Sequence, residues 1–330
     1  MKKILFATTA LVATAGVAAA DVSFGGYARF GVDYNDSRAT EEVRITSRFR
    51  LVVTASAESD NGLSFGAQIR YQADANEDTY KITSLTPVTN GTGSTVAVGL
   101  GKAGFNTPRF WVSTGGLTVS VGHIMGAFEN MPGIYAGSVG LTGLGYANVV
   151  TNYGVDFYTS GAAGRFGFDV VYSAGAFGVH LTHTFDDAYL AASNSGVSRT
   201  GIVASYSMGD YTFALGVQDS DVVTDTDWAF TAGGSFGAFD LTLQVADNGT
   251  NDTKYGIAGN YNLSAATSLQ GYVNVDTRAA FDVPGGEDMN IGLGFVHNMG
   301  GGTSLRGGVA SLAGAAGNTV RADLGLLFSF

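Results

Sequence analysis

Apolar and polar residues alternate along almost the whole length of the sequence. In residues 63–71 every second side chain is apolar, and the residues between them are polar, charged or glycine. Residues 211–218, 253–263 and 319–330 follow the same rule. A period of two is typical of β-strands with one apolar face, and no useful length of chain has the 3.6-residue period of an amphipathic helix. We therefore expect an all-β protein.

Turn-forming residues divide this pattern into a series of predicted strands. Their connections alternate between short turns, such as 59–62 and 209–210, and long links, such as 74–106 and 125–164. Residues 153–172 admit two interpretations, because YGVDFYTS fits either a further strand or the end of a long link; an even strand count favours the link. The sixteen predicted strands are residues 22–34, 42–57, 63–73, 107–114, 117–124, 165–173, 177–185, 199–208, 211–218, 227–236, 239–246, 253–263, 268–276, 289–297, 303–311 and 319–330.

The non-apolar faces of these strands distinguish two architectures. A soluble sandwich would expose those faces, which would then be rich in Lys and Glu. Here they are mostly Gly, Ser, Thr, Asn and Gln, and charged residues are only 14% of the chain. A transmembrane barrel instead places its apolar faces against lipid and its polar faces against internal water, and closure leaves no strand edge unpaired. We therefore predict a transmembrane antiparallel β-barrel of 16 strands, a size that encloses an aqueous channel rather than a packed core.

The N-terminal segment MKKILFATTALVATAGVAAA has two lysines, a short apolar run and a small-residue ending before Asp21. This layout is typical of a secretory signal peptide; the alternative, a transmembrane anchor, would be followed by a stop-transfer pattern, and none is present. We expect residues 1–20 to be removed and residues 21–330 to form a single barrel domain. The loss of Lys2 and Lys3 takes the net charge from −11 to −13, and the chain has no cysteine to form a disulfide.

Positive charge gathers in one part of this acidic chain. Arg44, Arg48 and Arg50 lie on one face of the second predicted strand. Each would cost about 2–4 kcal/mol against lipid near the middle of a membrane, so the strand must turn them inward. Arg29 and Arg70 join them from the two neighbouring strands. Solvation of an inner wall explains inward arginines but not their clustering, so we predict a basic wall that faces water or carboxylates.

Sequence motifs for catalysis lack the context that they require. GLGKAG at 99–104 matches a dinucleotide-binding pattern and GGSFG at 233–237 matches a nucleophile elbow, but neither lies between a strand and a helix. His180 and His183 are three residues apart on a strand, so they point to opposite faces and cannot share a metal. We expect no enzymatic activity and no cofactor.

Four stretches resemble one known family: TSRFRLVVTASAESDNGLSFGAQIR at 46–70, GHIMGAFE at 122–129, YSAGAFGV at 172–179 and LGLLFSF at 324–330. On these stretches the chain resembles the general-diffusion porins of alphaproteobacterial, Rhodobacter-type outer membranes, and the resemblance covers the mature chain from end to end. It implies a homotrimer in the Gram-negative outer membrane, a long third loop that folds into each barrel and narrows it, and an assembly signal at Phe330. It also implies that the arginine side of the constriction consists of Arg29, Arg44, Arg48, Arg50 and Arg70.

The third long link, residues 125–164, departs from the pattern of that family. The family's third loop is rich in Asp and Glu, whereas this one contains only Glu129 and Asp156. Asp33 and Glu42 are the further carboxylates that we expect on the acidic side of the constriction, opposite the arginines. The family can carry structural Ca2+ at this loop, and the scarcity of carboxylates argues against that ion here. We expect a channel that discriminates weakly by charge or favours anions.

The same link is rich in apolar side chains, and loops of such length are usually functional or disordered. Apolar residues disfavour disorder in water, so we expect this loop to pack inside the barrel against the wall. The side chains concerned include Ile134, Tyr135, Val139, Leu141, Leu144 and Tyr146.

These observations favour a passive outer-membrane channel for small hydrophilic solutes and ions. Two alternatives stay open: a substrate-specific channel whose third loop presents Tyr135 and Tyr146 to a ligand, and a non-conducting barrel that serves as an adhesin or structural wall protein. The expected partners are further copies of the chain, outer-membrane lipid and lipopolysaccharide, with no nucleic acid. Acidic links at 219–227 and 247–252 offer carboxylates for divalent-cation bridges to lipopolysaccharide, although solvation alone also explains them.

Overall fold

The structure is a computed structural model, and two of the sequence predictions fall outside the residues that it describes. These are the signal peptide, residues 1–20, and the ambiguous segment 153–160, which contains the predicted site residue Asp156. Across the described part of the chain there is no helix long and apolar enough to cross a membrane. The described residues are 21–76, 84–87, 94–97, 103–151, 166–185, 198–221, 223–249, 253–277 and 288–330.

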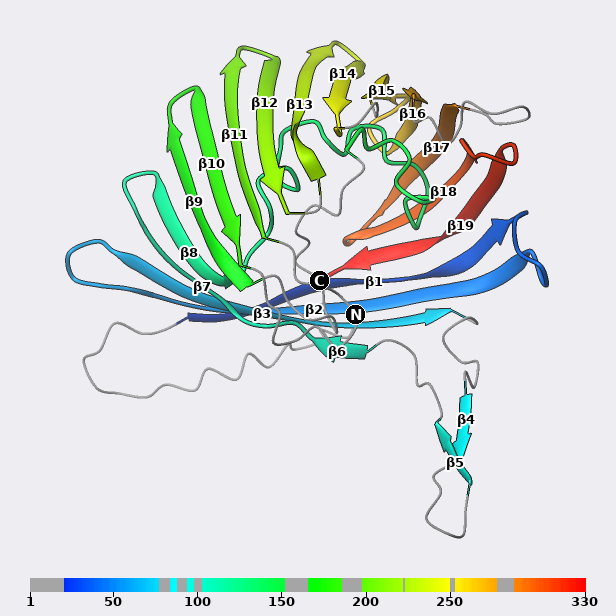
Figure 1. The fold of residues 1–330 in the computed structure, drawn as a ribbon, viewed down its shortest axis with the longest axis horizontal. Helices are drawn as coiled ribbons and strands as arrows, with labels where there is room; N and C mark the ends of the chain where they lie inside the picture. The colour runs from blue at the N-terminus through cyan, green and yellow to red at the C-terminus, as the bar shows by residue number, and fades with distance from the viewer. Residues whose placement is uncertain are drawn as a thin grey trace, which may run out of the picture.

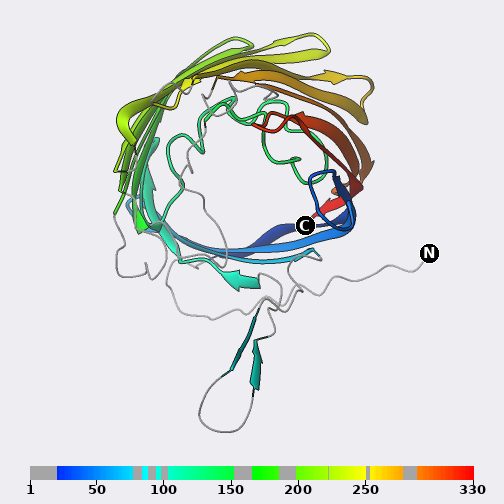
Figure 2. The same cartoon turned by 45° about the vertical axis from the view of Figure 1, so that its right-hand side comes forward.

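The wall strands are β1 (Asp21–Asn35), β2 (Val43–Glu58), β3 (Ser64–Asn76), β6 (Ala103–Phe105), β7 (Arg109–Thr114), β8 (Leu117–His123), β9 (Phe166–Ala174), β10 (Phe177–Thr184), β11 (Arg199–Met208), β12 (Tyr211–Ser220), β13 (Val223–Phe236), β14 (Phe239–Asp247), β15 (Thr253–Asn262), β16 (Thr267–Asp276), β17 (Met289–Gly300), β18 (Thr303–Leu312) and β19 (Thr319–Ser329). Strands that are neighbours around the ring pair antiparallel, and β1 pairs with both β2 and β19, which closes the ring (Figures 1 and 2). Both β6 and β7 pair with β3 and share one position, so the 17-stranded sheet that the described residues form is a barrel of sixteen wall positions. The predicted fold is confirmed.

The fourth wall position is interrupted between β6 and β7, where the sequence predicts a single strand from 107. The Asn106 side chain replaces part of the ladder there: its Oδ1 accepts a hydrogen bond from the Arg70 backbone N–H at 2.6 Å. Pro108 has no N–H to donate, but its carbonyl accepts a bond of 3.1 Å from the His123 N–H. The preceding link also contains a hairpin that the sequence does not predict, formed by β4 (Ser84–Pro87) and β5 (Ser94–Ala97).

Alternation along β2 separates the two sides of the wall as predicted. The side chains of Val43 and Ile45 point outward and are 60% and 65% exposed in the isolated barrel. In a membrane this apolar outer surface would contact lipid. Arg44, which lies between these two residues, and Thr46, which follows Ile45, are buried inside the barrel. Register with β1 pairs Asp33 with Arg44, so these two charged residues share the inner face.

The C-terminal residue completes the seam between β19 and β1. The backbone N–H of Gly26 donates to the Phe330 carbonyl at 2.9 Å, and the Phe330 N–H donates to the Gly26 carbonyl at 3.1 Å. The Phe330 ring stacks on Phe49 of β2 with centroids 5.7 Å apart. Phe330 therefore contributes to closure of the barrel; its role as an assembly signal stays a prediction.

Candidate functional site

Residues 124–151, which follow β8, lie inside the ring along the inner faces of the strands from β11 to β19 (Figures 1 and 2). We call these residues loop 3. Phe128, Ile134 and Val150 are buried in one apolar cluster with small residues of the wall, including Ala214 and Ala229. Each side chain of this size contributes about 1.5–3 kcal/mol on full burial. Alanines on the inner wall leave the room that these larger side chains fill.

A second apolar cluster extends this packing along the loop. It contains Val139 and Leu144 from loop 3 and Ala258, Tyr272 and Ala310 from the wall. The predicted packing of the third loop inside the barrel is thus confirmed for its described part.

Wall side chains also hold the loop backbone by hydrogen bonds. Gln244 of β14 donates from Nε2 to the carbonyls of Gly133 at 2.6 Å and Ile134 at 3.1 Å. Thr231 of β13 donates from its hydroxyl to the Pro132 carbonyl at 2.6 Å. These bonds satisfy backbone groups of a loop that has no regular secondary structure, as burial requires.

Asp323 of β19 anchors the far part of loop 3. Its carboxylate accepts hydrogen bonds from the Leu141 N–H at 2.8 Å, the Thr142 N–H at 2.6 Å and the Thr142 hydroxyl at 2.7 Å. Gly31 and Gly325, paired in register beside it, let the Leu141 side chain reach the wall, since a Cβ at either position would lie within 2.9 Å of Leu141 Cδ2. Asp323 was not among the predicted site residues, because nothing in one sequence links β19 to loop 3.

The inner faces of β1, β2 and β3 carry most of the predicted arginines. Arg48 forms an ion pair with Asp74 and donates to the Tyr27 hydroxyl at 3.2 Å. Gln72 connects that pair to Arg50: it accepts from Arg50 Nε at 2.7 Å and donates to Asp74 at 2.7 Å. The Arg50 guanidinium lies 4.9 Å from the centre of the Tyr27 ring. Asp74 also went unpredicted, although its position on the inner face of β3, opposite Arg48, follows from alternation and register.

Arg29 and Arg70 extend the same face toward loop 3. Arg29 donates from Nη1 to the Leu141 carbonyl at 2.8 Å. The positive charge of Arg70 acts on Glu129, which is the one predicted acidic residue of the loop that the structure describes. We call Arg29, Arg48, Arg50 and Arg70 the basic wall; the fifth predicted arginine, Arg44, lies at the start of β2 and is bonded to the link before it.

Glu129 is half-buried beside Tyr135, whose hydroxyl donates to its carboxylate at 2.5 Å. Burial raises the pKa of Glu129 to about 7, although the Tyr135 hydrogen bond and the charge of Arg70 act in the opposite direction. Burial, followed by the hydrogen bond with Glu129, raises the pKa of Tyr135 above its ordinary value. Glu129 therefore titrates near neutral pH, and a proton removes its charge.

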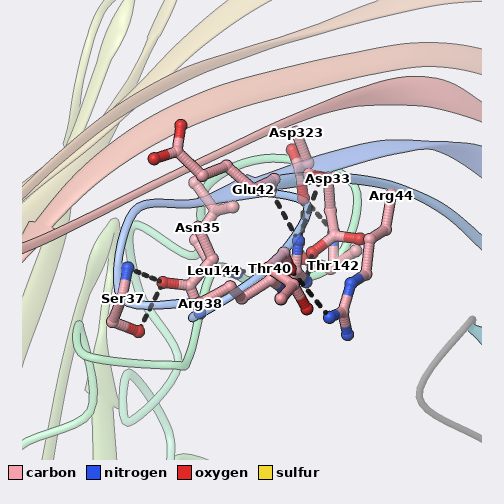
Figure 3. A network of polar contacts seen from close by, with 10 residues as sticks. All are labelled: Asp33, Asn35, Ser37, Arg38, Thr40, Glu42, Arg44, Thr142, Leu144 and Asp323. Carbon is pink, nitrogen blue, oxygen red and sulfur yellow. Dashed lines mark hydrogen bonds and ion pairs between the residues drawn. The ribbon is translucent and has the colours of Figure 1, made fainter.

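Three predicted site residues lie near the ends of β1 and β2 that the link 36–42 joins (Figure 3). Arg44 is buried there and donates from Nη2 to the Thr40 carbonyl at 3.2 Å. Asp33 forms an ion pair with Arg38, whose Nη1 also donates to the Glu42 carbonyl at 2.8 Å.

The prediction that Asp33 and Glu42 oppose the arginines is therefore wrong, because adjacent strands place Asp33 on the same wall as Arg44 and the Glu42 side chain is exposed at the link. Asp156 lies outside the described residues.

Comparison with known proteins assigns the family. The family model for Gram-negative porins matches residues 7–315. The chain is 30% identical to the porin of Fuscovulum blasticum over 322 residues, which cover 94% of this chain and 100% of the relative. The chain belongs to the Gram-negative porin family.

Other members and solved structures agree with this assignment. The porin of Rhodobacter capsulatus is 26% identical over 346 residues, which cover 94% of this chain and 100% of that porin. An engineered variant of the Rh. blastica porin superimposes with a TM-score of 0.74 at 27% identity, covering 94% of this chain and 100% of the variant. The chain is thus an outer-membrane porin channel, as its sequence predicts.

Proposed function

We propose that this porin is a general-diffusion channel whose constriction lies between loop 3 and the basic wall, and that three copies assemble in the membrane. The observation that carries the proposal is the packing of loop 3 on the inner wall, which leaves the basic wall as the facing side of the pore. The loop packs on the strands beyond β10, and the basic wall lies on β1 to β3. Ions that pass between them cross a field directed from one side of the pore to the other. The homotrimer is proposed from family membership.

The balance of charge at this constriction favours anions. The basic wall has four positive charges, of which Arg48 is paired with Asp74. Glu129 adds a full negative charge only above its raised pKa of about 7. We therefore propose weak preference for anions in a chain whose net charge is −11 before processing.

The competing idea of a substrate-specific channel gains no support from the two tyrosines. Tyr135 and Tyr146 pack against each other edge to face with centroids 6.1 Å apart, and the Tyr135 hydroxyl is bonded to Glu129. These contacts give the pair a role within the loop. A Ca2+ site likewise gains no support: among the described residues no three His, Cys, Asp or Glu side chains gather as metal ligands would.

Deletion of residues 137–146 tests the constriction. This stretch contains Val139 and Leu144, which pack on the wall, and Thr142, which is bonded to Asp323. Without it, single-channel conductance should rise and larger sugars should enter liposomes that contain the folded protein. Thr142→Val, which keeps the loop at full length, should leave the sugar cutoff unchanged. Equal conductance and an equal cutoff in the deletion variant would place the constriction elsewhere.

A further inference from the structure

A cavity of about 440 Å³ lies on the inner face of the barrel, between the seam of β1, β2 and β19 and the end of loop 3. Its strand residues belong to the inward-facing set, so the cavity belongs to the lumen and not to the lipid side. Residues that line it include Arg29, Arg38, Arg321, Asp33, Thr142 and Tyr146.

The charges around the cavity do not cancel. Arg29, Arg38 and Arg321 supply three positive charges and Asp33 supplies one negative charge, which leaves a net +2. Asp33 is already held by Arg38 in an ion pair (Figure 3). The nearby carboxylate of Asp323 accepts its hydrogen bonds from loop 3.

Two of these arginines carry unused hydrogen-bond donors. The Nε atoms of Arg29 and Arg321 are buried and have no hydrogen-bond partner within the described structure. Because these two atoms are enclosed by protein, a ligand in the cavity would bond the other N–H groups of the arginines that line it. The absence of a side chain at Gly145 leaves room for the Arg321 guanidinium, since a Cβ at that position would lie 2.9 Å from Arg321 Nη1.

We propose that this cavity is a binding site for a small dianion, namely inorganic phosphate or the phosphate group of a small phosphorylated solute. Guanidinium groups match phosphate because their planar N–H donors bond two oxygens at once, and a dianion neutralises the net charge of the cavity. This inference rests on the proposed channel, since the ligand would enter from the lumen. The site lies beside the diffusion path and raises the local concentration of phosphorylated solutes in the pore.

Calorimetric titration of the folded, detergent-solubilised protein with inorganic phosphate tests the site. The wild type should bind phosphate and should bind chloride far more weakly. Arg321→Gln should weaken phosphate binding about tenfold, the scale of one charged hydrogen bond. Arg321→Lys keeps the charge and should retain more affinity than Arg321→Gln. The matched control is Arg306→Gln, an inward arginine of β18 bonded to Ser304, which should bind phosphate as the wild type does.

Absence of phosphate binding by the wild type, or equal affinities of the Arg321→Gln and Arg306→Gln proteins, would overturn the inference. Conductance of the same samples separates this result from the proposed function. A wild type that conducts but binds no phosphate would contradict the proposed site and would agree with the proposed channel. A barrel that conducts no current but binds phosphate through Arg321 would support the site and contradict the proposed channel.

Discussion

Replacement of Asp323 by alanine should release the end of loop 3 without unfolding the barrel. The carboxylate accepts three hydrogen bonds from the loop, two from backbone N–H groups and one from the Thr142 hydroxyl. Hydrogen bonds to a charged group contribute about 1.5–3 kcal/mol each, but water from the lumen will replace part of this in the variant. We therefore expect a net loss of about 3 kcal/mol in loop docking, which corresponds to roughly a 150-fold change in the docking equilibrium.

Hydrogen exchange measures this change directly. In Asp323→Ala, the amides of Leu141 and Thr142 should exchange roughly 150-fold faster, in line with the lost docking energy. Thr142→Val removes the hydroxyl's bond to Asp323 and a longer bond of 3.3 Å from the Leu144 N–H, and should accelerate exchange by about fivefold, since it loses about 1 kcal/mol. Amides around Ile134 should keep their protection in both variants, because Gln244 holds that part of the loop separately. Unchanged exchange at Leu141 and Thr142 in Asp323→Ala would refute the assignment of Asp323 as the anchor.

Three further outcomes follow from the charges and the N-terminus. Replacing Arg48 and Arg50 by glutamine should move the reversal potential in a salt gradient toward the value of a cation-selective channel. Arg306→Gln should move it less. Equal shifts in the two proteins would place the basic wall away from the narrowest point. Because burial raises the pKa of Glu129 to about 7, a rise in pH through neutrality adds a negative charge at the constriction and should reduce the preference for anions. Glu129→Gln should abolish that pH dependence, and its persistence would assign the titration to another group. Mass spectrometry of the membrane fraction should find a chain that begins at Asp21, and a retained leader would contradict the signal-peptide prediction.

Much of the wall could be predicted because alternation is a local property. Membrane lipid requires one face of each strand to be apolar, so the sequence determines which side chains of β2 point inward, and the inward positions of Arg48 and Arg50 follow. The partner of Arg48 required one further step, the register of β3, since Asp74 lies 26 residues away along the chain.

The conformation of loop 3 could not be predicted in the same way. Its composition indicates packing inside the barrel, but an irregular chain has no period from which the positions of its residues can be worked out. Its anchor is separated from it by 182 residues at the Leu141–Asp323 hydrogen bond, and one sequence gives no sign of so distant a contact. Asp33 was misplaced for a related reason: its charge suggested opposition to the arginines, whereas strand pairing puts it beside Arg44.

The reversal potential of the wild-type channel in a planar bilayer with a salt gradient tests the central claim most directly. An open channel with a near-zero or anion-selective reversal potential at neutral pH is expected, because the basic wall outweighs Asp74 and a partly protonated Glu129 at the constriction. Strong selectivity for cations would show that the overall acidity of the chain, and not the basic wall, sets the field in the pore. A folded barrel that conducts no current would contradict the account altogether.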